Sequence, residues 1–136
     1  MRSFPDPGPD TAPFLGSWTL ERYVARSPEG ETAMLGENGT GLITYTADGA
    51  MSAHLVADKT RPGGHMAFYT SYYGSFSVDT EQQVVTHQVH AATEPSLSGK
   101  ALKRRFRFEG NRLVLSAQIG ERLHELTWQR AGEAGR

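Results

Sequence analysis

The alternating pattern of FLGSWTLERY, residues 14–23, returns in LHELTWQR, residues 123–130, near the other end of the chain. Each stretch carries one of the two tryptophans, Trp18 and Trp128. Apolar and polar residues that alternate with a period of two are typical of a β-strand with one buried face. We therefore expect the first and last strands of one sheet, each with a large indole on its buried side.

The same alternation recurs between these two stretches, and no segment shows a helical period of useful length. Gly, Asn and Asp bound the alternating segments, and Gly120-Glu121 fits a two-residue type II′ hairpin. The pattern predicts an all-β barrel or sandwich, in which the longer connection 57–70 is the expected lid. The expected strands are 18–26, 40–46, 50–56, 71–78, 83–91, 101–108, 112–119 and 122–130, with a short extra strand or turn near 31–35.

Composition narrows the class of protein. The 136 residues suit one domain, and the lack of cysteine excludes disulfides and thiolate metal sites. A net charge of −1 gives no field to hold nucleic acid or an anionic membrane. The Pro-rich start lacks the apolar core of a secretory signal, and no apolar run is long enough to span a bilayer. We expect a cytoplasmic protein with an N-terminal arm at 1–13, a barrel at 14–130 and a disordered tail at 131–136, and we keep a homodimer open.

Pairing neighbouring strands through their shortest turns, without bulges, aligns the inward side chains in rows. The rows are Val78–Gln83–Phe108–Leu113–Trp128, Phe76–Val85–Phe106–Leu115–Leu126, Gly74–His87–Arg104–Ala117–His124 and Tyr72–Val89–Leu102–Ile119–Arg122. The third row sets His87, Arg104 and His124 beside the small residues Gly74 and Ala117, which leaves volume that a packed core would fill. A buried Arg without a partner is costly, so an anionic or carbonyl-bearing ligand, water or a carboxylate is expected beside it.

Closure of the sheet into a barrel would explain why the two tryptophans lie near opposite ends of the sequence. Antiparallel pairing of the first strand with the last brings Trp18 and Trp128 to one end of a barrel, where we expect them to seal the floor. Arg130 shares the inward side of its strand and is expected to stack on Trp18. Gly16 lets the entering segment turn tightly across the opening. These four residues are the expected structural base.

Several segments resemble one known family. Gly16-Ser17-Trp18, balanced by an Arg at the end of the last strand, is similar to the lipocalin pattern. Residues 34–55, 72–90 and 104–116 resemble the bacterial lipocalin-like domain family in the same order, so that the resemblance covers about residues 14–130. It implies an eight-stranded antiparallel up-and-down β-barrel with one internal ligand cavity. Similar barrels include binding proteins as well as isomerases and cyclases of natural-product pathways, so the fold leaves catalysis open.

The candidate catalytic residues are His87, Arg104 and His124. The alternative is that His87 and Arg104 form a buried polar pair that fixes the register and binds nothing. The candidate ligand-binding residues are Arg22, Tyr45, Tyr72, Phe76, Phe106 and Arg122. The tyrosines combine an apolar ring with a phenol, yet tyrosine is also a common strand residue. The two arginines could equally turn their heads into solvent.

Other kinds of site are not supported. His87 and His90 stand three apart on a strand and point to opposite faces, so they cannot chelate one metal. GENGTG, residues 36–41, precedes no helix and fails as a phosphate cradle. LKRRFRF, residues 102–108, turns its basic side chains mainly outward, which favours a solvated face over a nucleic-acid site. No Gly-x-Ser-x-Gly elbow is present. We expect no metal and no cofactor.

The leading expectation is a barrel that holds one small, largely apolar ligand with a polar or anionic handle. The alternative is a cofactor-free isomerase or cyclase acting on a carbonyl-bearing, polyketide-like intermediate. In that case His87 would move the proton, while Arg104 and a Tyr would stabilise the enolate charge. A module that binds partners through its outer face is a third interpretation, but it leaves the inward polar row unexplained.

Overall fold

Nine strands and two 3-10 helices follow one another in the described part of the chain. A computed structural model describes residues 4–6, 8–58 and 69–132. The elements are η1 (Pro9–Phe14), β1 (Gly16–Ser27), β2 (Gly30–Ala33), β3 (Thr40–Tyr45), β4 (Ala50–Val56), β5 (Tyr69–Asp79), β6 (Val84–Ala92), η2 (Pro95–Leu97), β7 (Ala101–Glu109), β8 (Arg112–Ile119) and β9 (Arg122–Arg130). Neither helix of the described residues is long and apolar enough to cross a membrane.

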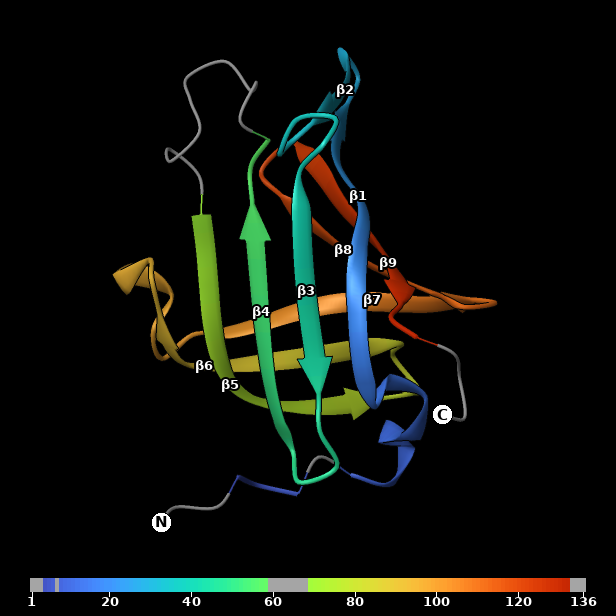
Figure 1. Ribbon diagram of the computed structural model, residues 1–136, viewed down its shortest axis with the longest axis vertical. Coiled ribbons are helices and arrows are strands. Elements are labelled where there is room, and N and C mark those ends of the chain that lie inside the picture. The colour runs from blue at the N-terminus through green and yellow to red at the C-terminus, as the bar shows by residue number, and fades with distance from the viewer. Residues whose placement is uncertain (1–3, 7, 59–68, 133–136) are drawn as a thin grey trace.

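The strands close into a barrel. Neighbours in the order β1-β3-β4-β5-β6-β7-β8-β9 pair antiparallel, and β9 pairs with β1. These eight strands confirm the predicted up-and-down β-barrel. β2 folds back on the end of β1, where β1 no longer pairs with β3, and it is the short extra strand expected near 31–35. Figure 1 shows β3 and β4 crossing steeply in front of β6 and β7, so the barrel has two layers.

Each predicted strand coincides with an observed one to within about two residues at either end. The 3-10 helix at Pro9–Phe14 was not expected; the sequence analysis placed only a tight turn before Gly16. Most of the connection 57–70, the expected lid, lies outside the described residues, as do parts of the arm 1–13 and of the tail 131–136.

The registers of the last three strands match the prediction. Phe108 lies opposite Leu113, and Ile119 lies opposite Arg122. Both connections are short turns with a glycine at positive φ, and such turns fix the register of the strands that they join.

The register of β5 with β6 differs from the prediction. Val78 pairs with Val85 and not with Gln83, because the connection after Asp79 takes in more residues and holds Gln83 in the left-handed region at φ 57°. The difference is two residues, and a shift of two keeps every side chain on its face of the sheet. The side chains of β5 and β6 that face inward are therefore the expected ones, although their cross-strand partners are not.

The register of β6 with β7 also differs by two. His87 lies opposite Leu102, and Arg104 lies opposite Val85, so the predicted direct pairing of His87 with Arg104 is wrong. The connection between these strands contains η2 and is too long for its length alone to fix a register.

Gly74 has a different role from the predicted one. Tyr73 pairs with Ala91 but Gly74 pairs with Val89, which leaves His90 as an extra residue in β6. At this bulge a Cβ on Gly74 would lie 1.8 Å from the carbonyl oxygen of Gln88. Gly74 thus does not open space in a ligand site; it lets the β6 backbone approach β5 closely at the bulge.

Replacing Gly74 tests this close approach. Gly74→Ala should lower the free energy of unfolding by about 2 to 3 kcal/mol, because backbone must move to admit the methyl group. Urea unfolding followed by circular dichroism measures the change. Gly120→Asn is the matched control: Gly120 has φ 62° with nothing within 4 Å of its Cβ position, and Asn tolerates that conformation. A Gly74→Ala protein as stable as the control would contradict the bulge.

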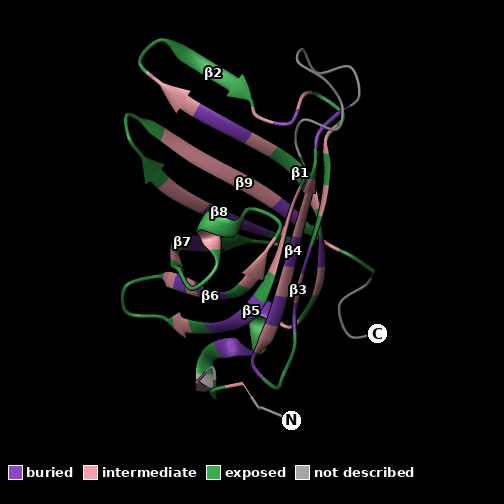
Figure 2. Ribbon diagram, turned by 90° about the vertical axis from the view of Figure 1, so that its left-hand side faces the viewer, coloured by how far each residue is buried: buried purple, intermediate pink, exposed green. Residues whose placement is uncertain are grey.

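The lower end of the barrel is closed by an aromatic plug. Phe14, at the end of η1, is fully buried and makes edge contacts with Tyr45, Phe106 and Phe108. The indole N–H of Trp18 donates to the backbone carbonyl of Phe14 at 2.9 Å. Figure 2 shows η1 beneath the strands, with buried positions in its ribbon. The plug therefore comes from the segment before β1 as much as from the strands.

The four residues of the predicted base do not all lie at the same level of the barrel. The Arg130 guanidinium lies 4.1 Å from the centre of the Trp18 ring and donates to the carbonyl oxygens of Pro13 and Leu15. Gly16 has φ 114°, a conformation that favours glycine. Trp128 pairs with Leu20, one step above the floor, and lines a cavity there.

Candidate functional site

A cavity of about 240 Å³ opens inside the barrel above the plug. Its apolar wall is formed by Ile43, Ala53, Leu55, Leu97, Leu102, Leu115, Leu126 and Trp128. Its polar side chains are Tyr23, Thr70, Tyr72, His87 and Arg104. A mainly apolar chamber with a few convergent polar groups is the usual form of a small-molecule site.

His87 is held between two tyrosines. It projects inward from β6 and is 1 % exposed. Its Nε2 lies 2.7 Å from the hydroxyl of Tyr45 on β3, and its Nδ1 lies 2.8 Å from the hydroxyl of Tyr72 on β5. Three strands far apart in sequence thus supply one hydrogen-bonded chain, Tyr45–His87–Tyr72.

The environment keeps this chain uncharged. Burial, and then the nearby charge of Arg104, lower the pKa of His87 to about 3, so the imidazole is neutral at neutral pH. Burial raises the pKa of Tyr72 to about 12 against the opposing effect of Arg104. Burial also raises the pKa of Tyr45 well above its ordinary value. Both phenols therefore keep their protons.

Arg104 brings the positive charge to the cavity. It lies on the wall, and one Nη donates to the carbonyl oxygen of Lys103 at 3.2 Å. Within the described residues no carboxylate pairs with it, whereas Arg26, Arg107 and Arg112 all have acidic partners. Arg104 thus lies on the cavity wall, but its partner across β6 is Val85 and not the predicted His87.

His124 stands behind the wall. Its Nδ1 lies 2.8 Å from the hydroxyl of Tyr23, and of these two only Tyr23 lines the cavity. Burial, and then the charges of Arg122 and Arg104, lower the pKa of His124. Burial raises the pKa of Tyr23. This second His–Tyr pair resembles the first, but the histidine reaches the chamber only through its partner.

Of the six expected ligand-binding residues only Tyr72 lines the chamber, and two of the other five, Arg22 and Arg122, lie on the outside of the barrel. Arg22 was expected to point inward, but β1 is irregular between Leu20 and Arg22, and the extra residue turns Arg22 to the outer face. There its guanidinium lies 2.7 Å from a carboxylate oxygen of Glu31. Arg122 also lies outside, at the β8–β9 turn, within 3.4 Å of the Thr32 hydroxyl.

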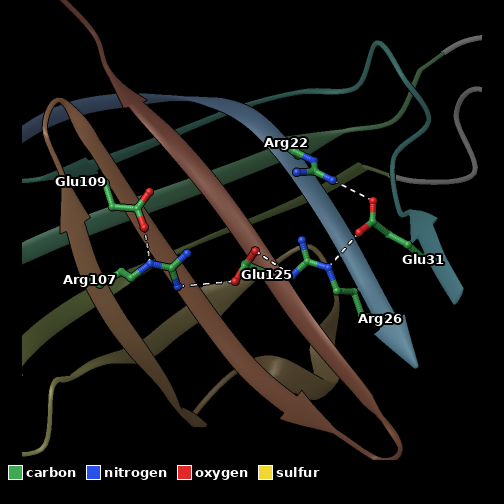
Figure 3. Close-up of polar contacts among 6 residues, drawn as sticks. All are labelled: Arg22, Arg26, Glu31, Arg107, Glu109 and Glu125. Atoms are coloured by element: carbon green, nitrogen blue, oxygen red, sulfur yellow. Dashed lines mark hydrogen bonds and ion pairs between the residues drawn. The ribbon is translucent and has the colours of Figure 1, made fainter. Parts of the chain in front are cut away.

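Arg22 belongs to a chain of alternating charges on the outer face (Figure 3). The chain connects β2, β1, β9 and β7 through Glu31, Arg26, Glu125, Arg107 and Glu109. Lys103, Arg105 and Arg107 are exposed on β7, which confirms that the basic residues of LKRRFRF mainly face outward. Exposed ion pairs of this kind contribute little to stability individually.

The remaining predicted residues divide between the plug and the cavity. Phe76 and Phe106 belong to the core cluster around Phe14 rather than to the cavity wall. Tyr45 is too deeply buried to line the wall and reaches the site through His87. Tyr72 lines the cavity as expected.

Some residues that line the cavity were not predicted to do so from the sequence. Tyr23 escaped because only the irregularity in β1 turns it inward, and the residue pattern does not show where a strand bulges. Leu97 comes from η2, in a connection without any alternating pattern. Trp128 was expected in the floor, but it lines the chamber, and its Nε1–H has no acceptor among the described residues. In the same part of the chain, no three His, Asp or Glu side chains gather as a metal site would require.

The chain was compared with solved structures, with curated protein sequences and with models of protein families. The chain is similar to the crystal structure of a mutant of the fluorescent protein UnaG, with a TM-score of 0.46 and 10 % sequence identity over 90 % of this chain and 99 % of that one. No curated protein sequence matches it. A family model described as a lipocalin-like domain matches residues 15–131, which takes in every strand of the barrel. The chain belongs to the lipocalin-like domain family.

Proposed function

We propose that the barrel binds one small, largely apolar molecule that carries a polar or anionic group. The observation that carries the proposal is the pairing of an apolar chamber with Tyr72 and Arg104, two polar groups on its wall. Membership of a lipocalin-like family supports small-molecule binding in general. The chamber is smaller than the roughly 300–1,000 Å³ of drug-sized pockets, so the proposed ligand is one ring or a short chain with a single handle.

Trp128 provides a direct test, because it lines the chamber while Trp18 lies below it. In a Trp18→Phe protein, titration with phenylbutyrate should change the fluorescence of Trp128 in a saturable way. In the converse Trp128→Phe protein, the same titration should leave Trp18 fluorescence nearly constant. A Trp128 signal that does not respond to the probe would contradict binding in the chamber.

Filling the chamber is the second arm of this test. Ala53 is buried on the wall, and Ala53→Phe places a ring where the ligand is proposed to lie. The apparent affinity for phenylbutyrate should fall by at least about tenfold, since the lost volume is comparable to that of the probe ring. Thermal unfolding checks that the variant is folded. Unchanged affinity in a folded Ala53→Phe protein would place the probe elsewhere.

The arrangement supports binding over the isomerase or cyclase alternative. Enolisation of a carbonyl compound needs a base to accept the carbon-bound proton. Both ring nitrogens of His87 are already hydrogen-bonded, and its pKa of about 3 makes it a weak base. Tyr72 and Arg104 would stabilise an enolate equally well in either case, so they do not favour catalysis.

A further inference from the structure

The hydrogen bonds around His87 have a direction that the geometry fixes. A neutral imidazole has one N–H donor and one acceptor nitrogen, so one tyrosine hydroxyl must donate to the ring and the other must accept from it. If Nε2 donated to Tyr45, the hydroxyl proton of Tyr45 would need a second acceptor. His87 is the partner of that hydroxyl within the described chain, and Tyr45 is 1 % exposed.

The opposite direction satisfies the hydroxyl of Tyr45 and both ring nitrogens of His87. Tyr45 then donates to Nε2, and Nδ1–H of His87 donates to the oxygen of Tyr72. The proton of Tyr72 is left over, and Tyr72, unlike Tyr45, lines the cavity, so this proton is available to a group inside it. A buried donor without an acceptor costs about 1–3 kcal/mol, so this direction is favoured by roughly tenfold or more.

The other strongly polar groups of the cavity are donors too. Arg104 can only donate, and no carboxylate of the described residues lines the chamber or pairs with it there. The Nε1–H of Trp128 is buried on the same wall without an acceptor in the described chain. The chamber thus combines a positive charge with hydrogen-bond donors, and what it lacks is a negatively charged acceptor.

We propose that the ligand binds as an anion, a carboxylate or enolate whose oxygen accepts the Tyr72 hydroxyl proton and neutralises Arg104. The proposal rests on the proposed function and names the chemistry of the handle. His87 is a positioning residue: both of its ring nitrogens are already hydrogen-bonded, so it offers the ligand no polar contact and sets the direction in which Tyr72 donates. Neutral carbonyl compounds of the same shape would gain the hydrogen bond without the charge pairing, and they would bind more weakly.

Two isosteric probes test the charge. Phenylbutyrate and phenylbutanamide differ in the group that ends the chain, and the acid should bind at least about tenfold more tightly, as expected for a hydrogen bond to an ion in place of a neutral one. Arg104→Met should bring the two affinities close together. Arg105→Met is the matched control, because Arg105 is the neighbouring cation on the exposed face of β7 and should keep the preference. Equal affinities in the wild-type protein would overturn the anion while leaving cavity binding intact.

The direction of the chain is tested without any ligand. Nitrogen NMR of the ligand-free protein at neutral pH should show His87 protonated at Nδ1 and not at Nε2. Tyr72→Phe removes the donor that faces the cavity and should cost the acid about tenfold in affinity, with thermal unfolding as the check on folding. A ring protonated at Nε2 would overturn the proposed role of His87, and an unchanged affinity of folded Tyr72→Phe would overturn that of Tyr72. If neither probe alters Trp128 fluorescence, the proposed function falls as well.

Discussion

Lowering the pH from 7 to 3 should reduce the free energy of unfolding by about 4 kcal/mol through His87 alone. Burial and the charge of Arg104 hold the pKa of folded His87 at about 3, whereas its ordinary value is 6.5. Between these values the unfolded chain binds a proton that the folded protein does not. The stability is therefore complete above the ordinary pKa and is lost progressively as the pH falls through this window.

Urea unfolding at several pH values measures this slope, and His87→Gln isolates the contribution of the histidine. Glutamine has a donor and an acceptor but does not titrate, so the free energy of unfolding of the His87→Gln protein should depend less on pH between about 6.5 and 3. The pKa values of Glu31 and Asp48 are lowered in the folded protein, and these carboxylates keep their own dependence in both proteins. His124→Gln is the control, because His124 is only half enclosed and should contribute less. Parallel pH curves for wild-type and His87→Gln proteins would contradict a neutral buried His87.

This expected loss at acid pH shows what the buried histidine costs the fold. An apolar side chain at position 87 would fill the same interior without a window of acid sensitivity. What His87 contributes instead is geometry, since it holds Tyr72 from behind with a defined hydrogen bond. A side chain that destabilises the fold yet orients a group on a cavity wall is typical of a functional site.

The sequence predicted the faces of the strands better than their neighbours. Alternation alone placed His87, Val85 and Val89 inward on β6, and all three are buried. It could not give the register of β6, because the turn before it extends to Gln83 and the connection after it contains η2, and because His90 is an extra residue in the ladder. A two-residue error leaves the faces intact but moves every cross-strand partner, which is why Arg104 was placed beside the wrong side chain.

Irregularities in the strands account for the errors in the site. One irregular residue in β1 turned Arg22 out to Glu31, and the inward position went to Tyr23, which was not among the candidates. The Tyr45–His87–Tyr72 chain was also missed as a unit, since it depends on three strands meeting in registers that turns and alternation do not specify. The sequence identified the types of residue in the site, but only the three-dimensional structure shows which of them are hydrogen-bonded to one another.

The largest effect of a single truncation is expected at Phe14. This ring is fully buried beneath the barrel and touches Tyr45, Phe106 and Phe108 at ring-centre distances of 5.4, 4.9 and 5.0 Å. Phe14→Ala should lower the free energy of unfolding by about 4 kcal/mol, because the ring loses its burial and its neighbours cannot collapse into the space. Urea unfolding followed by tryptophan fluorescence measures the change.

Two comparisons separate the plug from a general effect of losing a ring. Phe108→Ala removes a neighbouring phenylalanine that is 36 % exposed, so it should cost clearly less than Phe14→Ala. Benzene should restore part of the thermal stability of Phe14→Ala, because an apolar cavity of this kind is able to bind it. Equal losses for the two variants, with no rescue by benzene, would mean that η1 lies loosely against the barrel. The floor would then depend on Trp18 and Arg130, whose stacking and backbone hydrogen bonds do not involve the Phe14 ring.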